Sequence, residues 1–162
     1  MHTDHRREMT FRPATTGDIG ALRQFEQGIV SAERPYDPTL RPEGVQYYDI
    51  EAMLRADNVH FIVAECSGRL VGCGFARIEN AKPYLSHARQ AYLGLMYVDP
   101  EFRGQSINGA IVERLKQWCR DQGVTELRLD VYSGNSVALG AYEKAGFRRH
   151  MIEMRLQLMP GG

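Results

Sequence analysis

The sequence predicts an α/β fold in which a mixed sheet of six or seven strands carries helices on both faces. Short apolar runs of strand length alternate with segments whose apolar residues recur at helical spacing. Two strands are joined by the turn Ser67-Gly68, which is too short for anything but an antiparallel hairpin. Two others, residues 91–98 and 125–132, flank a helix, which predicts a right-handed parallel crossover.

The first part of the chain should contribute one strand and two helices. Residues 10–14 form a short strand, and residues 15–18 offer N-cap side chains for the helix that follows. The apolar face of that helix is Ile19, Leu22, Phe25 and Ile29. Residues 31–44 are irregular because three prolines interrupt them. A second helix is predicted over 45–56, with Tyr48, Ala52 and either Leu54 or its neighbours on its packing side.

The middle of the chain should supply three strands of the sheet. Residues 60–66 are almost continuously apolar, which is typical of a central strand. The hairpin turn leads into a glycine-containing strand over 70–78. A polar loop over 79–90 then precedes the apolar strand 91–98.

The segment 98–120 has the order strand, tight loop, helix, and its helix face consists of Ile107, Ile111, Leu115, Trp118 and Cys119. The first turn of a helix leaves about four backbone N–H groups without partners, and the helix dipole adds positive charge there. Arg103 and three small residues, Gly104, Ser106 and Gly109, would let a phosphate approach. The same pattern is also typical of a plain tight connection, and the P-loop and G-x-G-x-x-G fingerprints are absent.

The last part should contain two strands around a helix. Gly123 ends the central helix, and residues 125–132 alternate as a half-buried strand does. Residues 133–136 cap a helix over 137–144. A final strand is predicted over 147–158, anchored by Met151, Met154, Leu156 and Leu158. A homodimer through this strand is compatible with the pattern.

Composition and charge narrow the class of protein. The 162 residues are 43% apolar and 25% charged, and their formal net charge is zero. One domain is therefore predicted over 10–159, after a flexible tail over 1–9. A neutral chain without a long apolar run predicts neither a nucleic-acid nor a membrane partner. The cysteines Cys66, Cys73 and Cys119 lack metal-ligand spacing, so we expect reduced thiols, no metal and a cytoplasmic protein.

Two motifs of the second half resemble the GCN5-related N-acetyltransferase (GNAT) family, which transfers the acetyl group of acetyl-CoA to an amine. They are V-D-P-E-F-R-G-Q-S-I-N-G from Val98 and S-G-N-S-V-A-L-G-A-Y-E-K-A-G-F from Ser133, and the resemblance covers about residues 91–150. It implies the acyl-CoA N-acyltransferase (GNAT) fold, acetyl-CoA as cosubstrate, no metal, and direct attack by a primary amine in a ternary complex. The acceptor would be a small-molecule amine, an amino acid or a peptide N-terminus.

The resemblance also implies roles for single residues. The coenzyme would be bound by the end of the 91–98 strand, by the following loop and helix start, and by two residues of the late motif. These residues are Met96, Tyr97, Val98, Arg103, Gly104, Gln105, Ser106, Ile107, Asn108, Gly109, Asn135 and Tyr142. The strand would separate from the segment 127–132, with the thioester between them. Tyr142 would be the catalytic acid that protonates the departing thiolate.

Two positions depart from the family's usual loop, Gln/Arg-x-x-Gly-x-Gly/Ala. Ser106 and Asn108 stand at its two small positions, where glycine allows a positive φ and close approach of phosphate. Asn tolerates the left-handed conformation, and both residues can cap a helix. We therefore expect the coenzyme to bind. The alternative is a degenerate, non-catalytic GNAT-like module that binds ligand in the same place.

The general base and the acceptor site stay open at this level. The segment Gln90-Ala91-Tyr92-Leu93 lacks the glutamate that many family members carry there. The candidates are Glu79, Asp130 and His87, or a chain of water molecules. Glu33, Asp37 and Tyr47 could receive a cationic amine, although a solvated connection explains their segment equally well.

Overall fold

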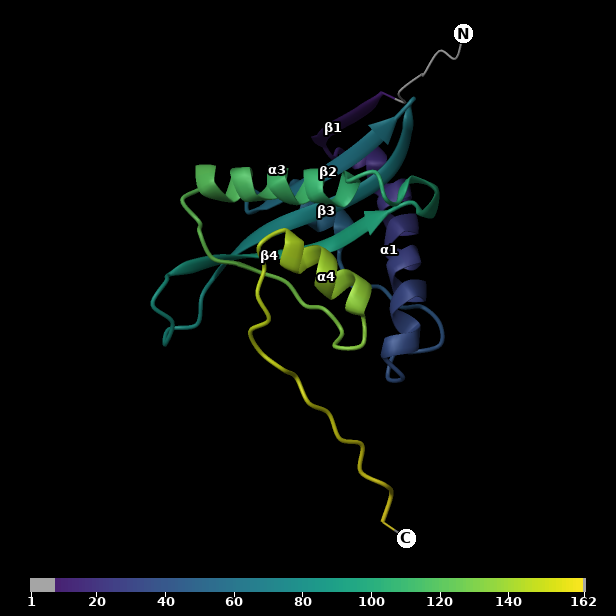
Figure 1. Cartoon of the computed structure of the whole chain (residues 1–162), viewed down its shortest axis with the longest axis vertical. Helices are drawn as coiled ribbons and strands as arrows, with labels where there is room; N and C mark the ends of the chain where they lie inside the picture. Colours follow the sequence, from purple (N-terminus) through teal and green to yellow (C-terminus); the bar gives the residue numbers. More distant parts are fainter. Residues whose placement is uncertain (1–7, 162) are drawn as a thin grey trace. The chain divides into compact units, whose positions relative to one another are not determined.

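The structure is a computed structural model that describes residues 8–161. The chain forms two compact units, one ending at Asp130 and one beginning at Val131 (Figure 1). The elements of the first unit are β1 (Met9–Pro13), η1 (Thr16–Asp18), α1 (Ile19–Glu33), η2 (Arg34–Tyr36), α2 (Ile50–Arg55), β2 (Val59–Cys66), β3 (Arg69–Asn80), β4 (Arg89–Val98), η3 (Pro100–Phe102), α3 (Ile107–Asp121) and β5 (Leu127–Arg128). The second unit contains α4 (Ser136–Lys144). The predicted tail over 1–9 lies mostly outside the described residues, and β1 begins at Met9.

The predicted mixed sheet is confirmed in the first unit. Its strands lie in the order β1-β2-β3-β4-β5. The pairs from β1 to β4 are antiparallel, and β5 runs parallel to β4 after the crossover through α3. Ser67 and Gly68 both have positive φ, 51° and 78°, which gives the two-residue turn that suits the twist of a hairpin.

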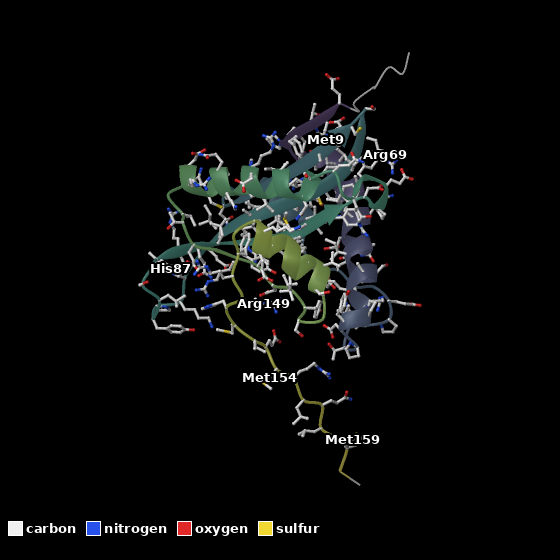
Figure 2. The ribbon with its side chains drawn as sticks, viewed as in Figure 1. Met9, Arg69, His87, Arg149, Met154 and Met159 are labelled. Carbon is white, nitrogen blue, oxygen red and sulfur yellow. The ribbon has the colours of Figure 1, made fainter. Side chains whose placement is uncertain are left out.

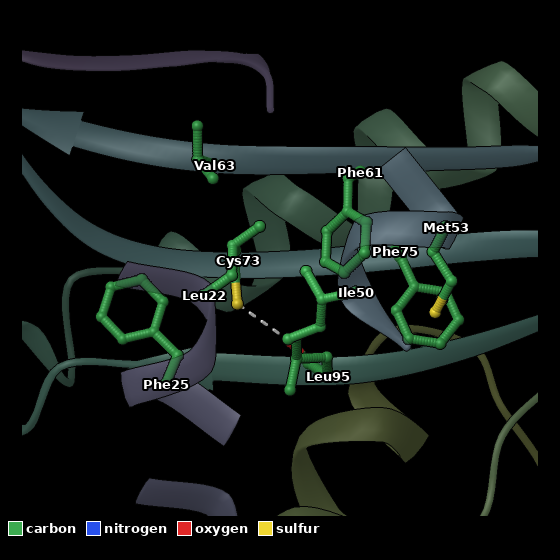
Figure 3. Close-up of a cluster of buried hydrophobic side chains, with 9 residues drawn as sticks. All are labelled: Leu22, Phe25, Ile50, Met53, Phe61, Val63, Cys73, Phe75 and Leu95. Carbon is green, nitrogen blue, oxygen red and sulfur yellow. Dashed lines mark hydrogen bonds between the residues drawn. The ribbon is translucent and has the colours of Figure 1, made fainter. Parts of the chain in front are cut away.

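Helices cover both faces of this sheet. On one face, apolar side chains of α1 and α2 pack against apolar side chains of β2, β3 and β4 (Figure 3). Together these helix and strand residues are Leu22, Phe25, Ile50, Met53, Phe61, Val63, Cys73, Phe75 and Leu95. On the other face, α3 buries Ile107, Ile111, Val112, Leu115 and Cys119. Gly72 and Gly74 allow α3 to lie close to β3, because a Cβ at Gly74 would come within 2.9 Å of the Ile111 side chain.

The prediction of six or seven strands is too high, since the sheet formed by residues 8–161 has five. Residues 147–158 form no strand, although Ile152, Met154, Leu156 and Leu158 alternate with polar residues. A strand is stabilised by hydrogen bonds to a neighbour, and the described residues of the second unit include no other strand. The segment after α4 therefore runs extended with exposed side chains, Met154 and Met159 among them (Figure 2).

The predicted helix over 45–56 is also shorter than expected, and α2 begins only at Ile50. The reason lies in α1, whose buried Glu26 accepts hydrogen bonds from the backbone N–H groups of Tyr47 and Tyr48 at 3.1 and 3.0 Å. Gln27 likewise donates to the carbonyl of Val45 at 2.8 Å. These side chains hold the backbone before Ile50 extended, and Met53 rather than Ala52 enters the core.

Candidate functional site

Strand β4 carries a β-bulge near its end. Cys73 of β3 pairs with Tyr97, whereas Phe75 pairs with Gly94, so two residues of β4 lie opposite the single residue Gly74. One of the two, Leu95, has a φ of 49°, which is uncommon for a residue other than glycine. The thiol of Cys73 donates to the carbonyl of Leu95 at 3.2 Å. A bulge redirects a strand and its backbone groups, and bulges of this kind are frequent beside active sites.

Pairing between β4 and β5 ends before the bulge. The ladder consists of Ala91 with Leu127 and Tyr92 with Arg128, and it extends no further among the described residues of the first unit. The outer edge of β4 from Leu93 to Val98 is therefore unpaired there. This agrees with the separation of the two strands that the family resemblance implied.

The residues expected to bind the pantetheine arm lie on this edge. The side chain of Met96 packs toward α3, since a Cβ on Gly74 would lie 2.6 Å from the Met96 sulfur. The ring of Tyr97 points to the opposite face, where it stacks on Phe25 with 4.8 Å between ring centroids. With these side chains fixed on either face, the backbone groups of residues 96–98 are held in place for a ligand along the edge.

The loop after β4 is anchored at both ends. Asp99 donates its backbone N–H to the carbonyl of Val71 at 2.8 Å, and its carboxylate pairs with Arg69 at 2.7 Å. Phe102 is buried beneath the loop. Arg103 to Ser106 are exposed, and the left-handed residues are Gly104 (φ 80°) and Ser106 (φ 60°). The loop is thus a fixed turn whose outer side faces solvent.

Helix α3 begins immediately after this turn. Its first intrahelical bond runs from the N–H of Ala110 to the carbonyl of Ser106 at 3.1 Å. The N–H groups of Ile107, Asn108 and Gly109 therefore have no acceptor within the helix. Ser106 is the N-cap residue, but its side chain makes no capping bond. The resulting end of the helix is a concentration of backbone donors and partial positive charge, which suits an anion.

The two departures from the family loop behave differently. Ser106 occupies the left-handed conformation that glycine usually supplies. Asn108 lies inside the first turn of α3, so its tolerance for a positive φ is not used. The backbone geometry expected of the loop is thus formed without glycine at either position, and the hydroxyl of Ser106 remains exposed next to the helix end.

The late-motif residues belong to the second unit. Asn135 is the N-cap of α4, and its side-chain oxygen accepts from the N–H of Ala138 at 3.2 Å. The ring of Tyr142 packs edge-on against Phe147 with 5.9 Å between centroids, and the N–H of Phe147 donates to the carbonyl of Tyr142 at 3.0 Å. The expected contacts of Asn135 and Tyr142 with the coenzyme stay predictions.

The three residues named for the acceptor lie together at the end of α1. The hydroxyl of Tyr47 donates to the carboxylate of Glu33 at 3.1 Å. Burial raises the pKa of Glu33, and the charge of Asp37 raises it further, against the effect of the Tyr47 hydrogen bond. Burial also raises the pKa of Tyr47 to about 12, with contributions from the two carboxylates. The group therefore combines negative charge with a protonated phenol.

The three candidates for the general base occupy different surroundings. Glu79 and His87 are both bound to Gln90, at 3.3 and 2.9 Å, toward the β3–β4 turn (Figure 2). Asp130 instead accepts a hydrogen bond from the hydroxyl of Tyr92 at 3.2 Å. The sequence did not mark Tyr92 as a functional residue, because a tyrosine in an apolar strand resembles a core residue.

Tyr48 is a second residue that the sequence analysis assigned only to packing. Its ring packs edge-on against Phe75 at 5.0 Å, and its hydroxyl lies 2.7 Å from where a Cβ on Gly94 would be. Burial raises the pKa of Tyr48, while a hydrogen bond with Tyr92 lowers it. Tyr48 and Asp130 thus both lie within hydrogen-bonding reach of the Tyr92 hydroxyl, which donates to Asp130.

Neither a metal centre nor a membrane span is found within residues 8–161. No cluster of three or more histidine, cysteine, aspartate or glutamate side chains there could hold a metal ion. No helix of this part of the chain combines the length and the hydropathy needed to cross a bilayer.

Solved structures with the same fold include several acetyltransferases. A mutant of the BH1408 protein from Bacillus halodurans aligns with a TM-score of 0.84 at 18% identity, over 93% of this chain and 99% of that one. A predicted acetyltransferase from Clostridium acetobutylicum, crystallised with acetyl-CoA, gives 0.72 at 19%, over 93% and 96%. Glucosamine-6-phosphate N-acetyltransferase from Arabidopsis thaliana gives 0.66 at 21%, over 94% and 99%.

The sequence itself matches a family model over residues 26–147, a span that runs from the middle of α1 to the end of the late motif. The matching family is described as the acetyltransferase (GNAT) family. Together with the bulged β4, the left-handed loop and the open end of α3, this match shows that the chain belongs to the GNAT acetyltransferase family.

Proposed function

We propose that this protein transfers the acetyl group of acetyl-CoA to a primary amine by direct attack in a ternary complex. The observation that carries the proposal is the arrangement of the loop 103–106 and the start of α3. There, two left-handed residues lead into the first turn of α3, where three N–H groups have no intrahelical acceptor. A diphosphate is the anionic part of coenzyme A that such a helix end suits.

The remaining coenzyme contacts fit the same side of the first unit. Arg103 is exposed at the start of the loop and supplies a positive charge for the diphosphate. The unpaired edge of β4 at residues 96–98 offers backbone donors and acceptors to the amide groups of the pantetheine arm. One of these N–H groups would stabilise the oxyanion of the tetrahedral intermediate, and the loss of such a donor typically costs about 2.7–4 kcal/mol.

Tyr142 is the proposed acid for the leaving thiolate. The proposal rests on its place in the family's late motif and on its position on α4 seven residues after the N-cap Asn135. Replacement of Tyr142 by Phe should remove turnover and leave the affinity for acetyl-CoA nearly unchanged. Unchanged turnover would contradict the role of Tyr142, and no acetyl transfer by either form would favour the non-catalytic module.

The acceptor is proposed to be a cationic small amine, an amino acid or a peptide N-terminus. The support is the negatively charged group at the end of α1, where Glu33 and Asp37 lie close enough for one carboxylate to raise the pKa of the other. One protein of the same fold is named glucosamine-6-phosphate N-acetyltransferase, and an N-acetyltransferase acts on an amine.

The coenzyme part of the proposal is tested by thermal unfolding with acetyl-CoA, with adenosine diphosphate as control. At 100 times its dissociation constant, acetyl-CoA should add about 2.7 kcal/mol to the unfolding free energy. Release of free thiol is then followed with ethanolamine, glycinamide, lysine and 1,4-diaminobutane as acceptors. A chain that gains no stability at millimolar acetyl-CoA would refute the proposed function.

A further inference from the structure

We propose that Asp130 is the general base of the acetyl transfer and that Tyr92 is the residue that positions it. This inference rests on the proposed function, since it assigns a residue to that reaction. The candidate bases are distinguished by the residues of β4 beside which each one lies, and the sequence alone does not give these neighbours.

The register of the sheet brings Asp130 to the point where β4 and β5 separate. Ala91 pairs with Leu127 and Tyr92 with Arg128, an offset of 36 residues in both pairs. The same offset places Asp130 level with Gly94, one residue before the bulge at Leu95. The Asp130 carboxylate, bound by the Tyr92 hydroxyl, thus belongs to the stretch of β4 that leads into residues 96–98, whose backbone groups would face the thioester carbonyl.

Tyr92 fixes the direction of this carboxylate. Its hydroxyl donates to Oδ2 of Asp130 at 3.2 Å. Its ring is held by Phe75, with 6.4 Å between centroids, and by the guanidinium of Arg77, 5.5 Å from the ring centre. Burial raises the pKa of Tyr92, and the neighbouring Tyr48 and Asp130 raise it further, so the phenol stays protonated and acts as the donor. Oδ2 is engaged by Tyr92, and Oδ1, which has no hydrogen bond among the described residues of the first unit, is proposed to receive the proton of the amine.

The other carboxylates and the histidine are placed less well. Glu79 and His87 share Gln90, which lies two residues farther from the bulge than Tyr92 and pairs with Glu79 in the ladder. Glu79 also lies 3.8 Å from Arg77. Glu33 is bound by the hydroxyl of Tyr47 at the end of α1. Among these groups, Asp130 is the one whose strand register brings it level with the start of the unpaired edge.

The proposed step balances as follows. The acceptor enters as an ammonium and gives one proton to the carboxylate of Asp130. The neutral nitrogen forms the C–N bond to the thioester carbon, and the C–S bond breaks. The nitrogen loses its second proton as the sulfur gains one, so the products are the amide, coenzyme A as the thiol, and the proton that Asp130 releases to solvent.

The experiment compares two kinds of nucleophile in the full-length protein. Hydroxylamine is unprotonated at neutral pH and needs no base, whereas the four amines named above are protonated there. Asp130→Asn should lower kcat for the best of these amines by about 10² or more, the usual lower range for a lost general base, and leave kcat for hydroxylamine near that of the wild type. Tyr92→Phe should lower kcat for the amine by about tenfold, the loss typical of one hydrogen bond.

The controls separate chemistry from folding. Glu126→Gln changes an exposed carboxylate on the same segment, 3.5 Å from Arg128, and should alter neither reaction. Asp130→Glu should restore part of the amine reaction, and the KM for acetyl-CoA should not change in any variant. Equal losses with both nucleophiles in Asp130→Asn, or full amine turnover in that variant, would overturn the role of Asp130. In either case, acetyl transfer to hydroxylamine by the wild type would still uphold the proposed function. A wild type that acetylates neither would overturn both.

Discussion

Glu26 joins α1 to the segment before α2, and its removal should be costly. Its side chain is 2% exposed, and one carboxylate oxygen accepts from the N–H groups of both Tyr47 and Tyr48. In Glu26→Ala each of these part-buried donors loses its acceptor, at about 1–3 kcal/mol apiece. We therefore expect a loss of about 3 kcal/mol or more in unfolding free energy.

Glu26→Gln keeps the shape and one acceptor oxygen but loses the charge, so its loss should be smaller, about 1–2 kcal/mol. Thermal and urea unfolding measure both variants, and about 3 kcal/mol corresponds to a fall in Tm of roughly 6–12 °C for a chain of this size. Glu51→Gln is the matched control, because Glu51 is exposed and pairs with Arg55 one helical turn away.

The alanine variant also has a functional consequence. Tyr48 packs beside Gly94 on β4, so loosening its backbone should raise the KM for the acceptor amine. Binding of acetyl-CoA should be unaffected, since Glu26 is hydrogen-bonded to the segment before α2, whereas the loop 103–106 follows β4. An alanine variant within about 0.5 kcal/mol of the wild type, the range of an ordinary surface substitution, would refute this reasoning.

Three further predictions, which use four substitutions, test other parts of the first and second units. Hydrogen bonds from Arg12 lower the pKa of Asp18, so the charged Asp18 stabilises the fold at neutral pH. Asp18→Asn should therefore have a lower unfolding free energy than the wild type at neutral pH. In urea unfolding this difference should shrink as the pH falls below about 4, because Asp18 of the wild type then becomes protonated. Gly74→Ala should lose about 1–3 kcal/mol through overpacking, whereas Gly140→Ala, with open space at its Cβ, should gain up to about 1 kcal/mol from helix propensity; equal changes would contradict the contacts described. Ser106→Gly should relieve about 1–2 kcal/mol of left-handed strain, partly offset by about 0.4–1 kcal/mol of unfolded-state entropy, and calorimetry should find acetyl-CoA bound at least as tightly.

Local chemistry made much of the fold predictable. The turn Ser67-Gly68 determines a hairpin by its length and by the positive φ that both residues adopt. The period of Ile107, Ile111 and Leu115 determines the buried face of α3, because helix geometry places residues four apart on one side. The order strand, loop, helix over residues 98–120, where the coenzyme is proposed to bind, was predictable for the same reason, since the segment is contiguous in sequence.

Long-range contacts account for the parts that were not predictable. Residues 45–49 have a helical pattern, but the side chain of Glu26, about twenty positions earlier, takes their backbone donors. The segment 147–158 has a strand pattern, but a pattern supplies no hydrogen-bonding neighbour. The pairing of Tyr92 with Asp130 depends on a register across 38 positions, and neither residue carries a local mark of it.

The thiol of Cys73 at the β4 bulge can report local opening of the sheet through its rate of alkylation. Burial raises the pKa of this thiol far above its usual range, so the thiolate that alkylating reagents attack is scarcely present in the closed state. Labelling of Cys73 therefore requires β3 and β4 to part, and its rate measures how often they do. Because Cys66 and Cys119 are also buried, the order in which the three thiols react would map the local opening of the sheet and of α3 without an introduced label.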